Sequence, residues 1–298
     1  MNAKVIGMNR VTLGTAGLGG TWRAVDLQQS VDTILYALDQ GITHFDMAPA
    51  YMDAELVVGR ALKQWKGENL FLSTKIGKRR GRADQKGLND YKIDSIKSSL
   101  NTSLERLERD YVDLLFLHEP DQIPRELIHS VIDTLLSFKK QGRVKKLGLG
   151  GKPSKLLTPF IEQGNFDVVM DFNGYNLVEH QALKADFPFY KKHNLEIYEG
   201  SPLMMGLLGR RLETYTKHPP SWLPLKTIRQ ASNLQELASE YDMMLATMAH
   251  RYLLYSNNID RMVIGPAVFS QMEATLNDIK EGPLEKGLLE KIHKIVNT

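Results

Sequence analysis

The chain contains the stretches Gly41-Ile42-Thr43-His44-Phe45-Asp46, Leu70-Phe71-Leu72-Ser73-Thr74-Lys75 and Val112-Asp113-Leu114-Leu115-Phe116-Leu117-His118. Each stretch is a short, mainly apolar run that ends on an ionisable residue. Runs of this length between polar residues are typical of buried parallel strands. In a barrel of parallel strands, the carboxyl ends of all strands face one common pocket. We therefore expect Asp46, Lys75 and His118 to lie close together at the mouth of such a barrel.

Further apolar runs continue this pattern along the chain and alternate with segments of helical spacing. We expect the other strands at residues 11–13, 144–151, 166–173, 195–199 and 261–264. Eight strands alternating with helices predict an α/β fold of the (β/α)8 TIM barrel type. Barrels of about 250 residues form one domain, so we expect residues 1–298 to be a single barrel domain.

The helices and loops between these strands are predicted from periodicity and from capping residues. Asp26, with Gln29 three residues later, resembles a capping box, and Gly41 ends the helix that follows. The other expected helices lie at residues 55–65, 93–107, 124–142, 154–163, 179–193, 234–241 and 246–255, with a short amphipathic helix after Pro283. We expect a hairpin at residues 4–9 and a polar loop at 77–89. A long loop at 200–227 has the length of a lid or binding loop.

Composition excludes several classes of protein. The net charge is +3, and the one basic cluster, residues 78–82, lacks the interleaved aromatic residues of a nucleic-acid site. It is more typical of a solvated loop or of a contact to a cofactor phosphate. The absence of cysteine excludes disulfides and thiolate metal sites, and we expect no metal. No signal pattern and no apolar run of the ~20 residues that span a bilayer is present, so a cytoplasmic protein without a membrane partner is expected.

Tyr51 adds a fourth group to the three strand-end residues, five positions after Asp46. A free phenol has a pKa of about 10 and is a poor proton carrier at neutral pH. An ammonium group such as that of Lys75 favours the phenolate, and a carboxylate keeps the ammonium charged and in place. The imidazole of His118 can orient a carbonyl or share the proton. Any one of these residues alone is more often structural, but the four together indicate proton transfer at an oxygen while a hydride moves.

The motifs around these residues resemble those of the aldo-keto reductase family, in the same order along the chain. The matching blocks are Asp46-Met47-Ala48-Pro49-Ala50-Tyr51 with Gly59-Arg60-Ala61-Leu62, Ser73-Thr74-Lys75, Asp110-Tyr111-Val112-Asp113 with His118-Glu119-Pro120-Asp121, and Ser201-Pro202-Leu203 with Gly206-Leu207-Leu208. The resemblance implies that Asp46, Tyr51, Lys75 and His118 are catalytic. It also implies a nicotinamide cofactor across the barrel mouth, with Ser201 and Leu203 against its pyrophosphate.

Three positions depart from the family pattern and imply rebuilt cofactor contacts. Gly200 stands where the family has an aromatic residue that stacks on nicotinamide. Gly150-Gly151 replaces the Ser-Asn that holds the carboxamide, and Ala274-Thr275 replaces the Glu-Asn near the adenine. We predict that Asn173, beyond the sixth strand, holds the carboxamide instead.

The glycine-rich segment after the first strand, residues 14–22, invites a dinucleotide-binding interpretation. The G-x-G-x-x-G spacing fails because Trp22 occupies the last position. Glycines here more simply allow the backbone to approach a ligand, so Gly20 and Thr21 are candidate cofactor contacts. Trp22 is either a core residue or a wall of the substrate pocket.

Residues 166–175 and 200–208 resemble the aldose-dehydrogenase branch of the family, which implies oxidation of a sugar at C1 to a lactone with NAD or NADP. One alternative is an NADPH-dependent aldehyde or ketone reductase. An alternative of another class is a redox-sensing subunit that binds the cofactor without turnover. A glycoside hydrolase using Asp46 and Glu55 is a weaker alternative, because Lys75 and Tyr51 have no role there. In every case the partner is a small molecule.

The stretch after the last strand, residues 265–273, bears on the choice of cofactor. Basic residues here hold the 2′-phosphate of NADP in related proteins, but this stretch contains no Lys or Arg and ends on an acid. Ser270 or Gln271 can instead hydrogen-bond a ribose hydroxyl. The alternative is that the acid faces solvent and that Arg210 or Arg211 supplies the charge. We predict that NAD is preferred.

Overall fold

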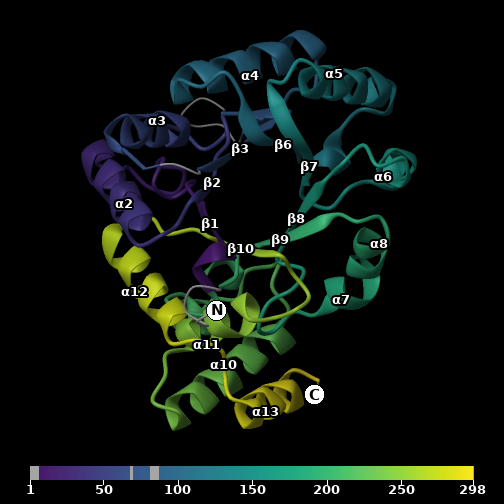
Figure 1. Cartoon of the computed structure of the whole chain (residues 1–298). Coiled ribbons are helices and arrows are strands. Elements are labelled where there is room, and N and C mark those ends of the chain that lie inside the picture. The colour runs from purple at the N-terminus through teal and green to yellow at the C-terminus, as the bar shows by residue number, and fades with distance from the viewer. Residues whose placement is uncertain (1–6, 68–69, 81–86, 298) are drawn as a thin grey trace.

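A computed structural model describes residues 7–67, 70–80 and 87–297. Within them, eight parallel strands close a barrel in the order β1-β10-β9-β8-β7-β6-β3-β2 (Figure 1). The strands are β1 (Val11–Gly14), β2 (His44–Asp46), β3 (Phe71–Ile76), β6 (Val112–His118), β7 (Val144–Gly150), β8 (Val168–Phe172), β9 (Glu196–Gly200) and β10 (Arg261–Ile264). The predicted (β/α)8 TIM barrel and all of its expected strands are confirmed.

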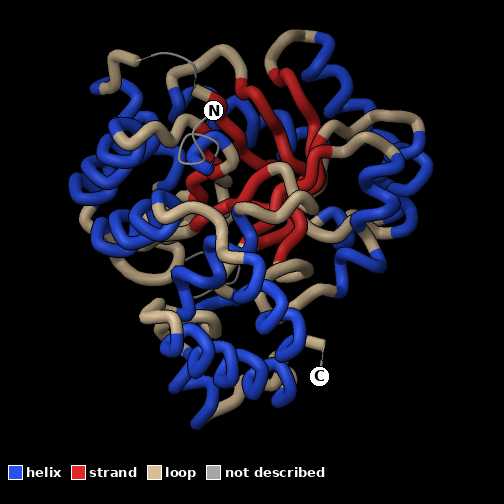
Figure 2. The backbone as a smooth tube through the Cα atoms, turned by 60° about the horizontal axis from the view of Figure 1, so that its bottom comes forward, coloured by secondary structure: helices blue, strands red, loops and turns tan. Residues whose placement is uncertain are grey.

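Helices surround the barrel and cover its outer face (Figures 1 and 2). They are α2 (Leu27–Asp39), α3 (Ala54–Gln64), α4 (Ile93–Leu107), α5 (Ile128–Lys140), α6 (Thr158–Glu162), α7 (Gln181–Ala185), α8 (Phe187–Lys192), α9 (Leu212–Lys217), α10 (Leu225–Glu240), α11 (Leu245–Leu254), α12 (Phe269–Lys280) and α13 (Lys286–Val296). In the described part of the chain, none of these helices is both long and apolar enough to cross a membrane.

Two apolar cores hold this arrangement, because successive residues of a strand point to opposite faces of the sheet. The larger core lies between the strands and the helices. The smaller core fills the barrel interior with Leu114, Phe116, Val168, Met170, Tyr198 and Val263. The barrel is therefore solid inside, and ligands have access only to its mouth.

Local signals explain where α2 begins and ends. Asp26 is its N-cap, and Asp26 Oδ1 accepts hydrogen bonds from the backbone N–H groups of Gln28 and Gln29 at 2.8 and 3.0 Å. The helix ends at Asp39, and Gly41, two residues later, has a φ of 92°, which is easily reached only without a side chain. This turn places the chain at the start of β2, which carries Asp46 to the barrel mouth.

Two of the predicted connections near the first strands need correction. The expected hairpin at residues 4–9 is wrong at 7–9, which form a helical turn, and residues 4–6 lie outside the described residues. The expected loop at 77–89 contains a short antiparallel pair, β4 (Lys78–Arg79) with β5 (Leu88–Asn89). Residues 81–86 of that loop lie outside the described residues.

Other corrections fall in the second half of the chain. The single helix expected at 179–193 is split into α7 and α8, because Pro188 lies in the first turn of α8 and cannot donate a backbone hydrogen bond to the preceding turn. The loop expected at 200–227 contains α9 and a 3-10 turn, Met204–Gly206. The helix expected from residue 234 begins earlier, at Leu225, directly after Pro224.

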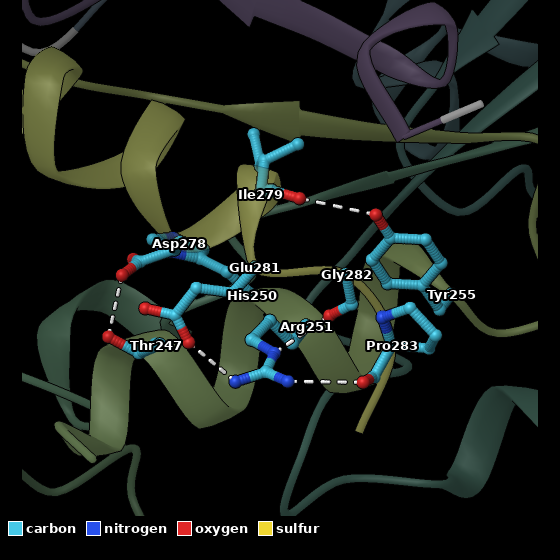
Figure 3. Close-up of polar contacts among 9 residues, drawn as sticks. All are labelled: Thr247, His250, Arg251, Tyr255, Asp278, Ile279, Glu281, Gly282 and Pro283. Carbon is cyan, nitrogen blue, oxygen red and sulfur yellow. Dashed lines mark hydrogen bonds and ion pairs between the residues drawn. The ribbon is translucent and has the colours of Figure 1, made fainter. Parts of the chain in front are cut away.

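A polar cluster joins α11 to α12 on the outer layer (Figure 3). Asp278 accepts from Thr247 Oγ1 at 2.6 Å and pairs with His250 Nδ1 at 2.8 Å. Arg251 donates to the carbonyl of Gly282 at 2.7 Å and pairs with Glu281 at 2.6 Å. The polar groups of this cluster hydrogen-bond to one another and hold the end of α12 against α11. The cluster is a structural feature separate from the barrel mouth.

Candidate active site

Asp46 and Lys75 form a buried ion pair at the carboxyl ends of β2 and β3. Lys75 Nζ contacts Asp46 Oδ2, and both side chains are almost fully buried. Lys75 also donates to the carbonyl of Met47 at 3.0 Å, and Ser73 Oγ donates to Asp46 Oδ1 at 2.9 Å. Burial opposes a charge on Lys75, but Asp46 and Tyr51 outweigh it and raise the pKa of Lys75 above 10.5. Lys75 is therefore an ammonium ion at neutral pH.

Tyr51 lies beside this pair on the loop that follows β2. The ammonium of Lys75 is 4.8 Å from the centroid of the Tyr51 ring. Burial raises the pKa of Tyr51 above 10.0, while the charge and hydrogen bonding of Lys75 act in the opposite direction. Lys75 thus favours the phenolate as expected, but desolvation is the larger effect. A Cβ on Gly19 would lie 2.2 Å from the Tyr51 carbonyl, so the β1 loop packs directly against the Tyr51 backbone.

His118 ends β6 and completes the group. Its ring meets that of Tyr51 edge-on, with centroids 5.8 Å apart. Its Nδ1 atom is buried and has no hydrogen-bond partner in the described part of the chain. Burial and then the charges of Lys75 and Lys78 hold the pKa of His118 well below 6.5. A neutral imidazole therefore faces the phenol of Tyr51.

Tyr91 fixes the backbone that carries His118, and the sequence had not singled it out. Its hydroxyl donates to the carbonyls of His118 and Glu119 at 2.8 and 2.6 Å. Glu119 has a φ of 50°, so the chain turns sharply at this point. A tyrosine outside the family-like motifs gave no local signal for this role.

Glu55, the second carboxylate of the glycosidase alternative, faces away from Asp46. It is buried, accepts from Thr74 Oγ1 at 2.7 Å and pairs with Arg106 at 3.1 Å. Thr74 alternates with Ser73 and Lys75, so Glu55 lies on the outer side of the β3 wall. Both of its oxygens are used by protein groups, and no pair of carboxylates flanks a common space at this point.

The ends of β8 and β9 hold the predicted carboxamide and pyrophosphate contacts. Asn173 and Ser201 directly follow these strands with φ values of 60° and 63°, a left-handed conformation that is uncommon for residues other than glycine. The Oδ1 atom of Asn173 is buried without a partner among residues 7–67, 70–80 and 87–297. Ser201 Oγ accepts from the N–H of Met205 at 3.0 Å, and the carbonyl of Leu203 accepts from Gly206.

The β1 loop brings Gly20, Thr21 and Trp22 toward the same rim. Gly20 has a φ of 93°, and the N–H of Thr21 donates to the carbonyl of Ala16 at 3.0 Å. Trp22 is 52% exposed, and its ring lies 3.5 Å from where a Cβ of Gly265 would stand. The core interpretation of Trp22 is therefore wrong, and an exposed wall remains.

The residues predicted to bind the ribose begin α12. Ser270 and Glu273 are exposed, and Gln271 Oε1 accepts from the N–H of Ala267 at 2.8 Å. The side chain of Arg211 is bonded to the hydroxyl of Tyr215 at 2.9 Å. In the basic cluster, Lys78 pairs with Glu119 and Arg79 pairs with Asp90, while residues 81 and 82 lie outside the described residues.

A pair of buried carboxyl groups, Asp171 and Glu199, lies just below the β8 and β9 ends and was also missed. The two residues are register partners on adjacent strands. Burial and then the charge of Asp171 raise the pKa of Glu199 well above 4.5, and burial raises the pKa of Asp171. An acid inside an otherwise apolar strand was the available signal. The pair sits on the outer side of the wall, against Gly174, because Met170 and Tyr198 face inward.

The mouth of this parallel barrel carries a Lys–Asp pair next to a tyrosine and a neutral histidine, a set of groups suited to proton transfer at an oxygen. The model of the Aldo/keto reductase family matches residues 10–297, and the chain belongs to this family. The protein is accordingly an NAD(P)-dependent oxidoreductase that acts on small molecules.

Proteins that are similar to this chain are consistent with the family assignment. The chain is 24% identical to L-galactose dehydrogenase of Arabidopsis thaliana, over 97% of this chain and 91% of that protein. It is 26% identical to D-threo-aldose 1-dehydrogenase of a Pseudomonas species, over 87% of this chain and 86% of that protein. The solved structure of a glycerol dehydrogenase from Gluconobacter oxydans superposes with a TM-score of 0.79 at 23% identity, covering 96% of this chain and 91% of that one. The last comparison supports the fold.

Proposed function

We propose that the protein oxidises an aldose at C1 to the corresponding lactone, with NAD as the preferred cofactor, in the cytoplasm. The observation that carries this proposal is the buried Lys75–Asp46 pair next to Tyr51 at the barrel mouth. Such a pair serves proton transfer at an oxygen, which sugar oxidation at C1 requires. L-galactose dehydrogenase and D-threo-aldose 1-dehydrogenase, both similar to this chain, support the choice of a sugar.

The residues on the β8 and β9 side fit a nicotinamide cofactor. The buried, unpartnered Oδ1 of Asn173 is an acceptor for a carboxamide N–H group. Ser201 and Leu203 would lie against the pyrophosphate, with Gly20, Thr21 and Gly200 allowing close approach of the backbone. Ser270 and Gln271 would lie near the ribose. When bound, the cofactor supplies the hydride acceptor, and the protein supplies the proton path.

Tyr51 is the proposed proton carrier. In the cyclic sugar, the phenolate of Tyr51 takes the proton of the C1 hydroxyl. The C1–H bond then breaks with its electron pair leaving as hydride, and the C1–O bond becomes the lactone carbonyl. In the reverse direction the phenol of Tyr51 returns the proton. General acid–base catalysis of this kind contributes about 10²–10⁴ in rate.

Lys75 and Asp46 adjust this step without leaving their places. The ammonium of Lys75 stabilises the phenolate and offsets part of the rise in pKa that burial causes in Tyr51. Asp46 keeps Lys75 charged and oriented, and Ser73 holds the second oxygen of Asp46. These contacts exist before any ligand arrives, so they cost no reorganisation during the reaction.

His118 orients the reacting oxygen as a neutral hydrogen-bond donor. Its pKa lies well below 6.5, so it carries no charge at pH 7. A neutral imidazole donates a hydrogen bond to the reacting oxygen through one nitrogen. The proton that is transferred therefore moves between this oxygen and Tyr51. Trp22, exposed on the opposite loop, offers a flat wall to the sugar ring.

A panel of aldoses and simple aldehydes, assayed with NAD and NADP through the absorbance of the reduced nicotinamide, tests the proposal. We expect sugar-dependent reduction of NAD and formation of a lactone. Turnover only in the direction of aldehyde or ketone reduction with NADPH would replace the proposal with that of a carbonyl reductase. Cofactor binding without turnover on any substrate would favour a redox-sensing subunit.

A further inference from the structure

Phe172 is the last residue of β8 and stands on the inner side of the barrel. Val168 and Met170, two and four positions earlier, belong to the interior core, so the alternation of the strand directs Phe172 inward as well. Unlike them, Phe172 is 58% exposed. Its ring therefore lies at the mouth, above the packed interior.

The last residues of the two strands that flank β8 are both glycines. Gly200 is the register partner of Phe172 on β9, and a Cβ built on Gly200 would lie 3.5 Å from the Phe172 ring. On the other neighbouring strand, β7 ends at Gly150 and is followed by Gly151. The Phe172 ring is thus a flat apolar surface that no side chain of Gly200 covers.

Phe172 also faces the proposed proton carrier across the mouth. In the order of the barrel strands, β8 is four places from β2 and hence diametrically opposite it. Tyr51 follows β2. A flat molecule lying against Phe172 has its free side turned toward Tyr51.

Next to this ring is an unmet hydrogen-bond acceptor. Asn173 Oδ1 is buried and unpartnered within the described chain, and the Asn173 backbone is tied to β9 by a bond from its N–H to the carbonyl of Gly200 at 3.4 Å. A flat apolar face beside a single acceptor is complementary to a planar ring that carries an amide N–H group. Nicotinamide with its carboxamide has this chemistry.

We propose that Phe172 is the stacking platform for the nicotinamide ring, positioning its free face toward the substrate. This inference rests on the proposed cofactor binding at the β8–β9 side. Phe172 takes, from the neighbouring strand, the place that a side chain at position 200 would have. It sets the orientation of the ring, and Asn173 sets its rotation within the stacking plane.

Binding measurements with and without the nicotinamide ring test this role. Affinities of Phe172→Leu, Phe172→Trp and the wild type are measured by calorimetry for NADH and for ADP-ribose, which lacks nicotinamide. Loss of base–aromatic stacking weakens binding by about 5- to 150-fold. We expect Phe172→Leu to lose affinity for NADH in this range and to keep its affinity for ADP-ribose, with Phe172→Trp close to the wild type.

Tyr111→Leu is the matched control, because Tyr111 is an aromatic residue 41% exposed just before β6, at the opposite end of the barrel. It should leave both affinities unchanged. Equal weakening of NADH and ADP-ribose in Phe172→Leu would overturn the inference by making Phe172 a general support. Unchanged NADH affinity with a raised KM for the sugar would overturn it by placing Phe172 against the substrate. A wild type that binds NADH but oxidises no aldose would refute the proposed substrate and leave the stacking result intact.

Discussion

The two halves of the barrel mouth are built on different principles. At the ends of β2 and β3, Asp46, Lys75 and Ser73 bond to one another in regular strand ends. On the β8–β9 side, Asn173 and Ser201 have left-handed backbones, and Asn173 Oδ1 has no partner within the described residues. Preorganised groups suit chemistry, whereas unmet groups suit the capture of a ligand that will satisfy them. This difference supports the proposal that the first half carries out proton transfer and that the second half binds the cofactor.

The strongest test of this division is Tyr51→Phe, which removes one hydroxyl from the reacting half. We expect kcat to fall by about 10²–10⁴ because the proton carrier is lost. Affinity for NADH and the melting temperature should stay within error of the wild type. Tyr241→Phe, on the outer layer, serves as the control in the same sugar assay. A Tyr51→Phe enzyme with nearly normal kcat would place the proton transfer on another group.

The second test concerns the pH dependence of sugar oxidation. In the proposed mechanism the phenolate of Tyr51 is the active form. Because the pKa of Tyr51 lies above 10.0, kcat/KM should rise with pH into the alkaline range. Lys75 lowers this pKa, so Lys75→Met should move the rising limb to higher pH and slow the reaction at neutral pH. Ionisation of His118 should not change kcat/KM between pH 6 and 8, because the pKa of His118 lies well below 6.5.

Removing Lys75 alone leaves the buried carboxylate of Asp46 without its ammonium partner. Breaking a buried ion pair in this way lowers the free energy of unfolding by about 3–5 kcal/mol. The double variant Lys75→Met, Asp46→Asn avoids this charge and keeps the pH measurement interpretable. If the limb stays in place while the rate falls, Lys75 holds geometry and does not act on the pKa of Tyr51.

The contrast between the halves also explains what the sequence could predict. Asp46, Lys75 and His118 each close an apolar strand, so periodicity alone brought them to one pocket, and the structure confirms that they meet. Their contacts connect strands that are neighbours in the barrel. The strand pattern likewise predicted the barrel itself, because each strand is a local property of the chain.

The β8–β9 half was less accessible, because its roles depend on packing between strands rather than on motifs. Asp171 and Glu199 become a pair only through strand register, and the role proposed for Phe172 depends on the absence of a side chain at Gly200 beside it. The split of the helix at Pro188 had a local signal, which the helical spacing of the surrounding apolar residues outweighed in the prediction. The short helices inside residues 200–227 depend on tertiary contacts, because short helices are marginal on their own.

A third test measures how the buried carboxyl group of Glu199, on the β8–β9 side, affects the stability of the fold. The pKa of Glu199 lies well above 4.5 in the folded protein. The contribution of Glu199 to the free energy of unfolding is fully present below the pKa that Glu199 has in the unfolded chain. It is lost as the pH rises toward the pKa that Glu199 has in the folded protein, because the unfolded chain releases this proton at a lower pH. Glu199→Gln cannot ionise, so its melting temperature relative to the wild type should increase steadily from pH 5 to pH 8.

Chains of this size shift by about 2–4 °C for each kcal/mol, so a gain of a few degrees at pH 8 is expected. Glu236→Gln, an exposed position on α10, should show no such trend. A constant difference between Glu199→Gln and the wild type across this pH range would mean that folding does not raise the pKa of Glu199.

The smallest expected effect concerns the choice between NAD and NADP. Residues 265–273 contain no Lys or Arg, Gln271 is tied to Ala267, and Glu273 is exposed on α12. A 2′-phosphate is a dianion that needs a cation to offset its desolvation, so the wild type should give the higher kcat/KM with NAD. Glu273→Gln should lower the ratio of kcat/KM with NAD to kcat/KM with NADP only a few-fold, because an exposed charge is screened by solvent and salt. The narrowing should shrink further at high ionic strength, and Glu236→Gln should leave the ratio alone. A clear preference of the wild type for NADP would instead place the phosphate against a cation from another segment, with Arg210 and Arg211 the first to replace by alanine.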